Sequence, residues 1–271
     1  MNMPRKRYDW KLKSRTLLLG ERTLIAGFLD LSSSEDPDRA FVRAIAFADQ
    51  GADMIELAAD PPVAGSAAVS EAEELRRLVP ALKRLKGKIE IPLAVLTSRH
   101  AIALKAIEHG AEILHDPTGL TLDLEIAKVA NQADAGLVLS HARGTPEGWV
   151  KLPGFKNPTE TVVQDLSATV SRATRTGVQR HRLMIDPGFG YGKRKEHNVE
   201  LLARLDQLAI LNLPILVAPY DKAFLPPQHD AAATALASLT TAILSGAHIV
   251  VSSEVPAARA AAQLADEVLR T

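Results

Sequence analysis

The strongest constraint on the fold of this chain is that apolar, strand-like runs alternate with helix-like segments along nearly its whole length. Strands are expected at 23–31, 53–58, 91–97, 112–115, 136–140, 183–186, 214–218 and 248–252, and helices at 36–50, 71–86, 99–109, 122–132, 159–176, 198–210, 231–245 and 256–270. The run from Pro214 to Ala218 has no polar alternation, which is typical of strands buried on both faces of a parallel sheet. Eight such units in 271 residues favour a single α/β domain, a (β/α)8 TIM barrel, with a doubly wound open sheet as the alternative.

The residues before the barrel carry two further signals. The apolar runs 16–19 and 23–31 flank Gly20 and Glu21, which suggests a short hairpin leading into the first barrel strand. Residues 1–15 are basic and contain no long apolar run, so we expect a solvated N-terminal tail and not a signal peptide. The barrel is then expected over residues 16–271.

The charge balance and the absence of cysteine narrow the function classes. Lys+Arg and Asp+Glu both number 32, so the formal net charge is zero and no global field favours nucleic acid. No apolar segment predicts a membrane span. With no cysteine, the chain has no disulfide and no thiolate metal site, which fits a cytoplasmic protein.

One strand end stands out as a candidate site. The apolar run Leu183–Ile185 ends at Asp186, and Pro187 and a Gly-x-Gly-x-Gly ladder that includes Gly190 follow it. In a barrel of this kind the C-terminal ends of the strands carry the chemistry. The ladder is not a Walker A loop, because Pro187 and Arg194 replace the required residues, and it does not match a dinucleotide fingerprint. A glycine-rich turn that only caps a strand is the alternative reading.

Two motifs here resemble a known family. The stretch D-P-G-F-G-Y-G-K, followed by E-H-N-V-E-L-L, is similar to the sixth-strand loop of dihydropteroate synthases, and V-L-S-H-A-R-G-T-P from Val138 is similar to their fifth-strand loop. The resemblance implies a pterin-binding barrel of folate biosynthesis, a transferase fold. It assigns Asp186 to the amino-pyrimidine edge of a pterin and Lys222 to the polar atoms of the ring. Asp116, His115 and Gly190 complete the implied pterin site, with His115 standing where the family has Asn.

Other positions depart from the family pattern. Asp30 stands where the family has Asn, Pro62 and Val63 stand at a Thr-Arg pair, and Leu96 replaces an Asp. The strand-eight R-x-H has become Val251–Ser253, and Ser140 replaces a Met. These positions handle diphosphate, Mg²⁺ or ring stacking in the family, and Pro, Val and Ser supply no cationic stabilisation. A rebuilt anion site would draw on Asp30, Arg99, Arg143 and Ser253.

Three hypotheses follow from this mixture. The first is a synthase-like barrel that keeps part of a pterin pocket, lacks most of the diphosphate and Mg²⁺ site, and has little or no synthase activity. The second is a working synthase that condenses 6-hydroxymethyl-dihydropterin diphosphate with p-aminobenzoate and uses Mg²⁺. The third is a related barrel that binds a folate or another heterocycle for methyl transfer. No catalytic residue is assigned, and the histidine spacing gives no metal motif.

The late helix at 231–245 suggests a partner. It is rich in small residues, which allow close approach of helices, and the family commonly pairs through this region. We therefore expect a homodimer built on the late helices.

Overall fold

The computed structural model describes residues 5–33, 36–219, 224 and 230–271 of the chain. Its main feature is an eight-stranded parallel sheet in the order β8-β7-β6-β5-β4-β3-β10-β9. An isolated parallel bridge between Ile185 and Ile215 joins the two ends of this order, so the sheet is a nearly closed barrel. The strands are β3 (Leu24–Asp30), β4 (Met54–Ala58), β5 (Leu93–Leu96), β6 (Ile113–Asp116), β7 (Gly136–Ser140), β8 (Leu183–Asp186), β9 (Leu216–Val217) and β10 (Ile249–Ser252).

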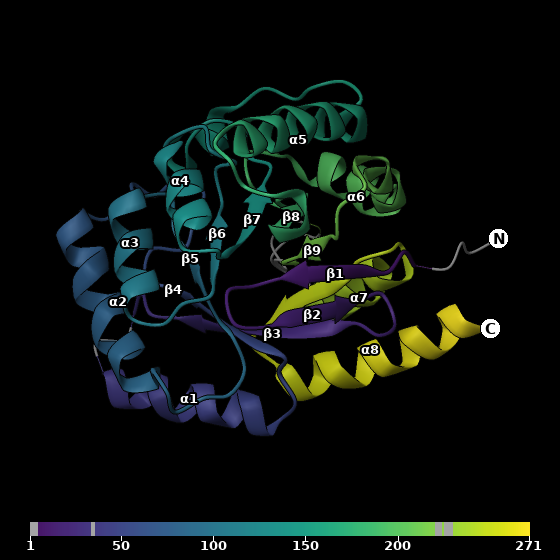
Figure 1. Cartoon of the computed structure of the whole chain (residues 1–271). Coiled ribbons are helices and arrows are strands. Elements are labelled where there is room, and N and C mark those ends of the chain that lie inside the picture. The colour runs from purple at the N-terminus through teal and green to yellow at the C-terminus, as the bar shows by residue number, and fades with distance from the viewer. Residues whose placement is uncertain (1–4, 34–35, 220–223, 225–229) are drawn as a thin grey trace.

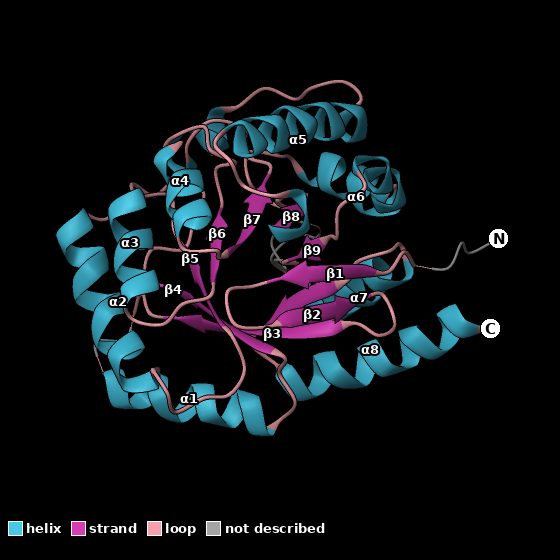
Figure 2. Cartoon of the chain, in the orientation of Figure 1, coloured by secondary structure: helices cyan, strands magenta, loops and turns pink. Residues whose placement is uncertain are grey.

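Helices lie outside the strands and connect them (Figures 1 and 2). They are α1 (Pro37–Asp49), α2 (Glu71–Leu85), α3 (His100–Glu108), α4 (Glu125–Gln132), α5 (Pro158–Arg175), α6 (Lys195–Ala203), α7 (Ala231–Leu244) and α8 (Val255–Arg270), with the 3-10 turns η1 (Pro146–Lys151), η2 (Arg180–Arg182) and η3 (Leu205–Leu211). The strand order follows the chain around the ring, without the reversal of a doubly wound sheet. The predicted (β/α)8 barrel is therefore confirmed.

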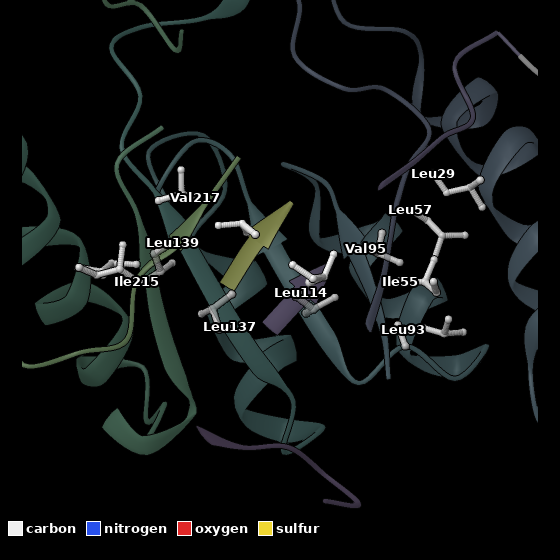
Figure 3. Close-up of a cluster of buried hydrophobic side chains, with 14 of the residues drawn as sticks. Leu29, Ile55, Leu57, Leu93, Val95, Leu114, Leu137, Leu139, Ile215 and Val217 are labelled. Atoms are coloured by element: carbon white, nitrogen blue, oxygen red, sulfur yellow. The ribbon is translucent and has the colours of Figure 1, made fainter. Parts of the chain in front are cut away.

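Two buried layers stabilise the barrel, because successive residues of a strand point to opposite faces. The outward-facing residues pack between sheet and helices; Figure 3 shows ten of them, Leu29, Ile55, Leu57, Leu93, Val95, Leu114, Leu137, Leu139, Ile215 and Val217. The inward-facing residues fill the barrel, among them Ala26, Met54, Ala94, Ile113, Val138, Met184, Leu216 and Ile249. Burial of each Leu, Ile, Val or Met among them stabilises the fold by roughly 1.5–3 kcal/mol.

Side-chain caps set the starts of α1 and α2 near the predicted positions. Asp36 accepts a hydrogen bond from Asp38 N at 2.9 Å, and Pro37 occupies the first turn of α1. Ser70 caps α2 in the same way by accepting from Glu73 N. The helix expected at 198–210 differs, because the structure has α6 and then the 3-10 turn η3 in its place.

The N-terminal residues differ from the prediction in two ways. A hairpin exists, but β2 (Thr16–Leu19) pairs antiparallel with β1 (Tyr8–Lys11), so the predicted pairing of 16–19 with 23–31 is wrong. Residues 5–15 are also not a solvated tail. Trp10 is 1% exposed, joins the interior cluster of the barrel and donates its indole N–H to Arg182 O at 2.9 Å. The apolar faces of this hairpin cover the end of the barrel where the strands begin, which is why it is ordered.

A second contact fixes the same segment. Arg5 forms a buried ion pair of 2.7 Å with Asp266 of α8, and it also donates to Thr23 and to the carbonyl of Ala247. The basic start of the chain is thus partly a structural clamp between the first residues and the last helix. Among the described residues, no helix is long and apolar enough to cross a bilayer.

Candidate functional site

Four polar side chains lie inside the barrel, on strands β4, β6, β7 and β8. Glu56 comes from β4, His115 from β6, Ser140 from β7 and Asp186 from β8, and each is at most 2% exposed. All four sit at inward-facing positions, two residues after the apolar interior residues Met54, Ile113, Val138 and Met184 of the same strands. Burial of polar groups is costly unless they bond to one another, and these four do.

The four side chains form one hydrogen-bonded chain. His115 Nδ1 lies 2.5 Å from Glu56 Oε1, and its Nε2 lies 2.8 Å from Ser140 Oγ. Ser140 Oγ in turn donates to Asp186 Oδ2 at 2.6 Å. The Nε2 of His115 is 3.5 Å from the same carboxylate oxygen. The resulting order is Glu56, His115, Ser140, Asp186.

The charge on His115 follows from its neighbours. Burial by itself lowers the pKa of this imidazole, but the carboxylates of Glu56 and Asp186 outweigh burial and raise the pKa to about 10. His115 is therefore a cation at neutral pH, and both of its N–H groups are engaged. With both ring nitrogens bound to protein partners, His115 has no free N–H for a ligand ring.

Sequence reasoning missed Glu56. A signal was present, because M-I-E-L-A places one acidic residue in an otherwise apolar buried strand. Such a residue needs a buried partner, and His115 supplies it.

The glycine ladder after Asp186 makes room for protein backbone. Gly188 has φ +64° and donates its N–H to Asp186 Oδ1 at 2.9 Å. A Cβ at Gly188 would lie 2.1 Å from the carbonyl oxygen of His141, and one at Gly192 would lie 2.5 Å from that of Arg143. Gly190 donates its N–H to Asn198 Oδ1. The loop after β8 thus packs tightly against the loop after β7, and this packing fixes the position of Asp186.

A buried lysine ties these two loops together. Lys193 Nζ donates to the carbonyl oxygens of His141 at 2.9 Å and of Gly188 at 2.7 Å. Burial lowers the pKa of Lys193 to about 7, although Asp186 acts in the opposite direction. The motif residue that follows the glycines is therefore a structural clamp close to the candidate site.

Asp116 does not join this group, contrary to the expectation that it lines the same mouth. It follows His115 on β6 and so faces the helices, as does its register partner Leu139. Its carboxylate accepts from Thr118 N and Oγ1, both at 2.8 Å, and from Leu120 N at 2.6 Å. These bonds fix the turn after β6, and Asp116 belongs to that turn.

The two arginines expected at an anion site, Arg99 and Arg143, contact other protein groups. Arg99 bonds Glu74 of α2 and donates to Val69 O at 2.6 Å, so it fixes the loop after β4. Arg143 donates to Pro153 O at 3.0 Å and lies over the ring of Phe155 at 4.2 Å.

Asp30 and Ser253 line separate cavities. Asp30 accepts from Ser32 N at 2.7 Å and borders a cavity of about 540 Å³ that Arg39 and Arg43 also line. Ser253 borders a cavity of about 650 Å³ between the ends of α7 and α8, next to Phe28 and Val251. An anion site built from Asp30, Arg99, Arg143 and Ser253 stays a prediction. Lys222 lies outside the described residues, so its assignment stays a prediction.

Comparisons with known proteins agree with the motifs. Residues 27–252 match the family described as pterin binding enzyme. A dihydropteroate synthase of Synechocystis is 31% identical, over 97% of this chain and 93% of that protein, and one of Clostridium beijerinckii is 32% identical over 79% and 80%. A dihydropteroate synthase structure from Yersinia pestis with a sulfonamide drug superposes with a TM-score of 0.89 at 26% identity, covering 97% of this chain and 100% of that one. The corresponding structure from Clostridium difficile with pteroic acid gives 0.85 at 28% identity, over 93% and 99%.

Proposed function

This chain belongs to the pterin binding enzyme family, and from that premise we propose that it is a dihydropteroate synthase-like barrel that binds a pterin-like small molecule and has little or no synthase activity. The observation that carries the ligand assignment is Asp186, a carboxylate fixed at the C-terminal end of β8 by Ser140 and Gly188. A carboxylate held in this way accepts two hydrogen bonds from an amino-pyrimidine edge.

The proposed lack of activity rests on the shortage of cationic side chains that could stabilise the leaving diphosphate. Displacing diphosphate from a pterin needs positive groups aimed at the leaving group, each worth about 10²–10³-fold in rate. Val251–Ser253 and Pro62–Val63 stand where the family pattern has cationic or polar groups. The side chains of Arg99 and Arg143 are held by carbonyl oxygens, Glu74 and the Phe155 ring. Loss of two such groups would leave little turnover.

A working synthase is the second candidate, and the relatives favour it. The Synechocystis dihydropteroate synthase is 31% identical over 97% of this chain and 93% of its own length. Such an enzyme would use Mg²⁺ to neutralise the diphosphate. Asp30 fits one oxygen ligand of that ion, and in the described part of the chain no group of three or more acidic or histidine side chains adds to it. The substrate phosphates would have to supply most other ligands.

The discriminating experiment compares two ligands on the full chain. Calorimetry measures binding of 6-hydroxymethylpterin and of its diphosphate ester, and a synthase assay runs at high enzyme concentration with p-aminobenzoate and Mg²⁺. We expect binding of the free pterin in the micromolar range or weaker, about −8 kcal/mol at most, little gain from the diphosphate, and turnover near background. A diphosphate ester that binds about a hundredfold more tightly, or robust turnover, would establish the second candidate instead.

We also propose that the protein forms a homodimer through α7 and α8. These helices pack on each other, and α8 presents Leu264 and Val268, one turn apart, at 68% and 47% exposure. Exposed apolar side chains on one helix face favour association with a partner surface.

A further inference from the structure

A buried ion pair lies next to the proposed ligand-binding carboxylate and has no direct role in ligand contact. Glu56 and His115 are 2% and 1% exposed, and both ring nitrogens of His115 are occupied by protein partners. Isolated burial of two such charges would cost several kcal/mol each by general estimates. The pair therefore needs a reason beyond stability.

The charges around His115 show what the pair does. Glu56 faces it from β4 and Asp186 from β8, while β7 contributes the neutral Ser140 and β5 the apolar register partner Leu96. On β6 itself, Asp116 faces the opposite side of the wall. Lys193 lies beyond Asp186, in the loop after β8. His115 thus lies between the carboxylates of Glu56 and Asp186 and contacts both of them.

The hydrogen bonds in the chain have one direction. Because the imidazolium donates from both nitrogens, Ser140 must accept from Nε2 and must place its own hydrogen on Asp186 Oδ2. The other carboxylate oxygen of Asp186, Oδ1, accepts a hydrogen bond from Gly188 N. The rotation of the Asp186 carboxylate is therefore set by a relay that begins at Glu56.

We propose that His115, held by Glu56, is the positioning residue that orients the Asp186 carboxylate for its ligand through Ser140. The role rests on the proposed pterin-binding function. Neither Glu56 nor His115 touches the ligand; they act through Ser140 and Asp186.

The proposal predicts coupling between the two residues. His115→Asn alone leaves the buried carboxylates of Glu56 and Asp186 without the cation between them and breaks the relay to Ser140, so affinity for 6-hydroxymethylpterin should fall about tenfold or more at pH 7. The double variant Glu56→Gln/His115→Asn removes both charges and should recover most of the loss. Wild-type affinity should be flat between about pH 6 and 8.5, because His115 keeps its charge over that range.

A second variant separates positioning from charge. Ser140→Ala keeps Glu56, His115 and Asp186 but breaks the link between them, and it removes only one hydroxyl, so folding is retained. Its affinity for 6-hydroxymethylpterin should fall roughly two- to tenfold, the usual range for one hydrogen bond, with the flat pH profile preserved. Unchanged affinity in Ser140→Ala would overturn the relay.

The closing experiment combines calorimetry on these variants with ¹⁵N NMR of the histidines, assigned through His115→Asn. We expect His115 to stay doubly protonated to at least about pH 9 in the wild type and to lose its proton at lower pH in Glu56→Gln. A neutral His115 at pH 7, or a double variant that binds no better than His115→Asn, overturns the positioning role while the wild type still binds pterin. A wild type that binds no pterin overturns the proposed function, and the positioning role falls with it.

Discussion

His115 and Asp116 are consecutive residues of β6, yet their side chains lie on opposite faces of the barrel wall. His115 points inward to Glu56 at 2.5 Å, and Asp116 points outward to Leu120 N at 2.6 Å. The alternation of a strand forces this separation. Two polar residues that the family resemblance placed in one site therefore contact different parts of the molecule.

This relationship predicts that Asp116→Asn affects stability and leaves the site intact. The amide of Asn cannot accept on both sides, so at least one donor among Thr118 and Leu120 loses its partner. We expect a loss of about 1–3 kcal/mol in the free energy of unfolding, measured in urea. Affinity for 6-hydroxymethylpterin should change by less than about twofold; a loss comparable to that of Asp186→Ala would place Asp116 in the site after all.

Asp186→Ala should abolish pterin binding. The substitution removes the acceptor for the ring edge, and the unpaired edge costs about 1–3 kcal/mol beyond the lost bonds. It also frees the hydroxyl of Ser140, which now donates to Asp186 Oδ2 at 2.6 Å. Calorimetry checks the effect, with Asp116→Asn as the matched carboxylate control. Binding that survives in Asp186→Ala would refute the assignment of this residue.

Much of the fold was predictable because its signals are local. The strand Gly136–Ser140 was located to the residue from a continuous apolar run, and α1 from the Asp36-Pro37 cap. The hairpin partner was not, because Y-D-W-K has only one strongly apolar residue among polar ones. What orders it is the contact of Trp10 with the barrel interior, which joins residues far apart in sequence.

The candidate site was predictable only in part. Asp186 follows an apolar strand, and its place at a strand end was readable. The roles of Arg99 and Arg143 were not, because their partners Glu74 and Phe155 come from tertiary packing. The outward direction of Asp116 follows from strand alternation once His115 is set inward.

Dimerisation should depend on the exposed face of α8. Light scattering at tens of micromolar should give a dimer, and Leu264→Glu should shift it to monomer, because a carboxylate cannot be buried there without a partner. Leu122, 56% exposed in the turn before α4, provides a matched control, and Leu122→Glu should remain dimeric. A monomeric wild type would rule out the dimer.

Acid should destabilise the fold through His248. Its Nδ1 accepts from Ile215 N at 3.1 Å and its Nε2 donates to Lys6 O at 2.9 Å, so only the neutral ring fits. Burial lowers its pKa to about 4. The unfolded chain then binds more protons between about pH 6.5 and 4, and the contribution to stability is lost as the pH falls through that window. His248→Gln can keep both bonds, so its free energy of unfolding in urea should fall less between pH 7 and 4.5 than that of the wild type. An equal fall would assign the acid sensitivity to other groups.

At alkaline pH two buried groups act in opposite directions on stability. The pKa of His115 is raised to about 10, because Glu56 and Asp186 outweigh burial, so the folded state binds the extra proton above about pH 6.5 and stability falls as the pH rises toward 10. The pKa of Lys193 is lowered to about 7 by burial, so the unfolded state binds the extra proton between about pH 7 and 10.5 and stability rises. Over about pH 7 to 10 these two slopes cancel in the wild type.

Lys193→Met should reveal the pH dependence of the free energy of unfolding that His115 contributes. Without the lysine, only the His115 contribution remains, and the free energy of unfolding should fall with rising pH by up to about 1.4 kcal/mol per pH unit relative to the wild type. The lost bonds to the carbonyl oxygens of His141 and Gly188 lower stability as well, but that loss shifts the whole curve and leaves its slope unchanged. Urea unfolding of both proteins from pH 7 to 9.5 measures the difference. Parallel curves would mean that Lys193 keeps its proton in the folded state, and that burial does not lower its pKa as far as neutrality.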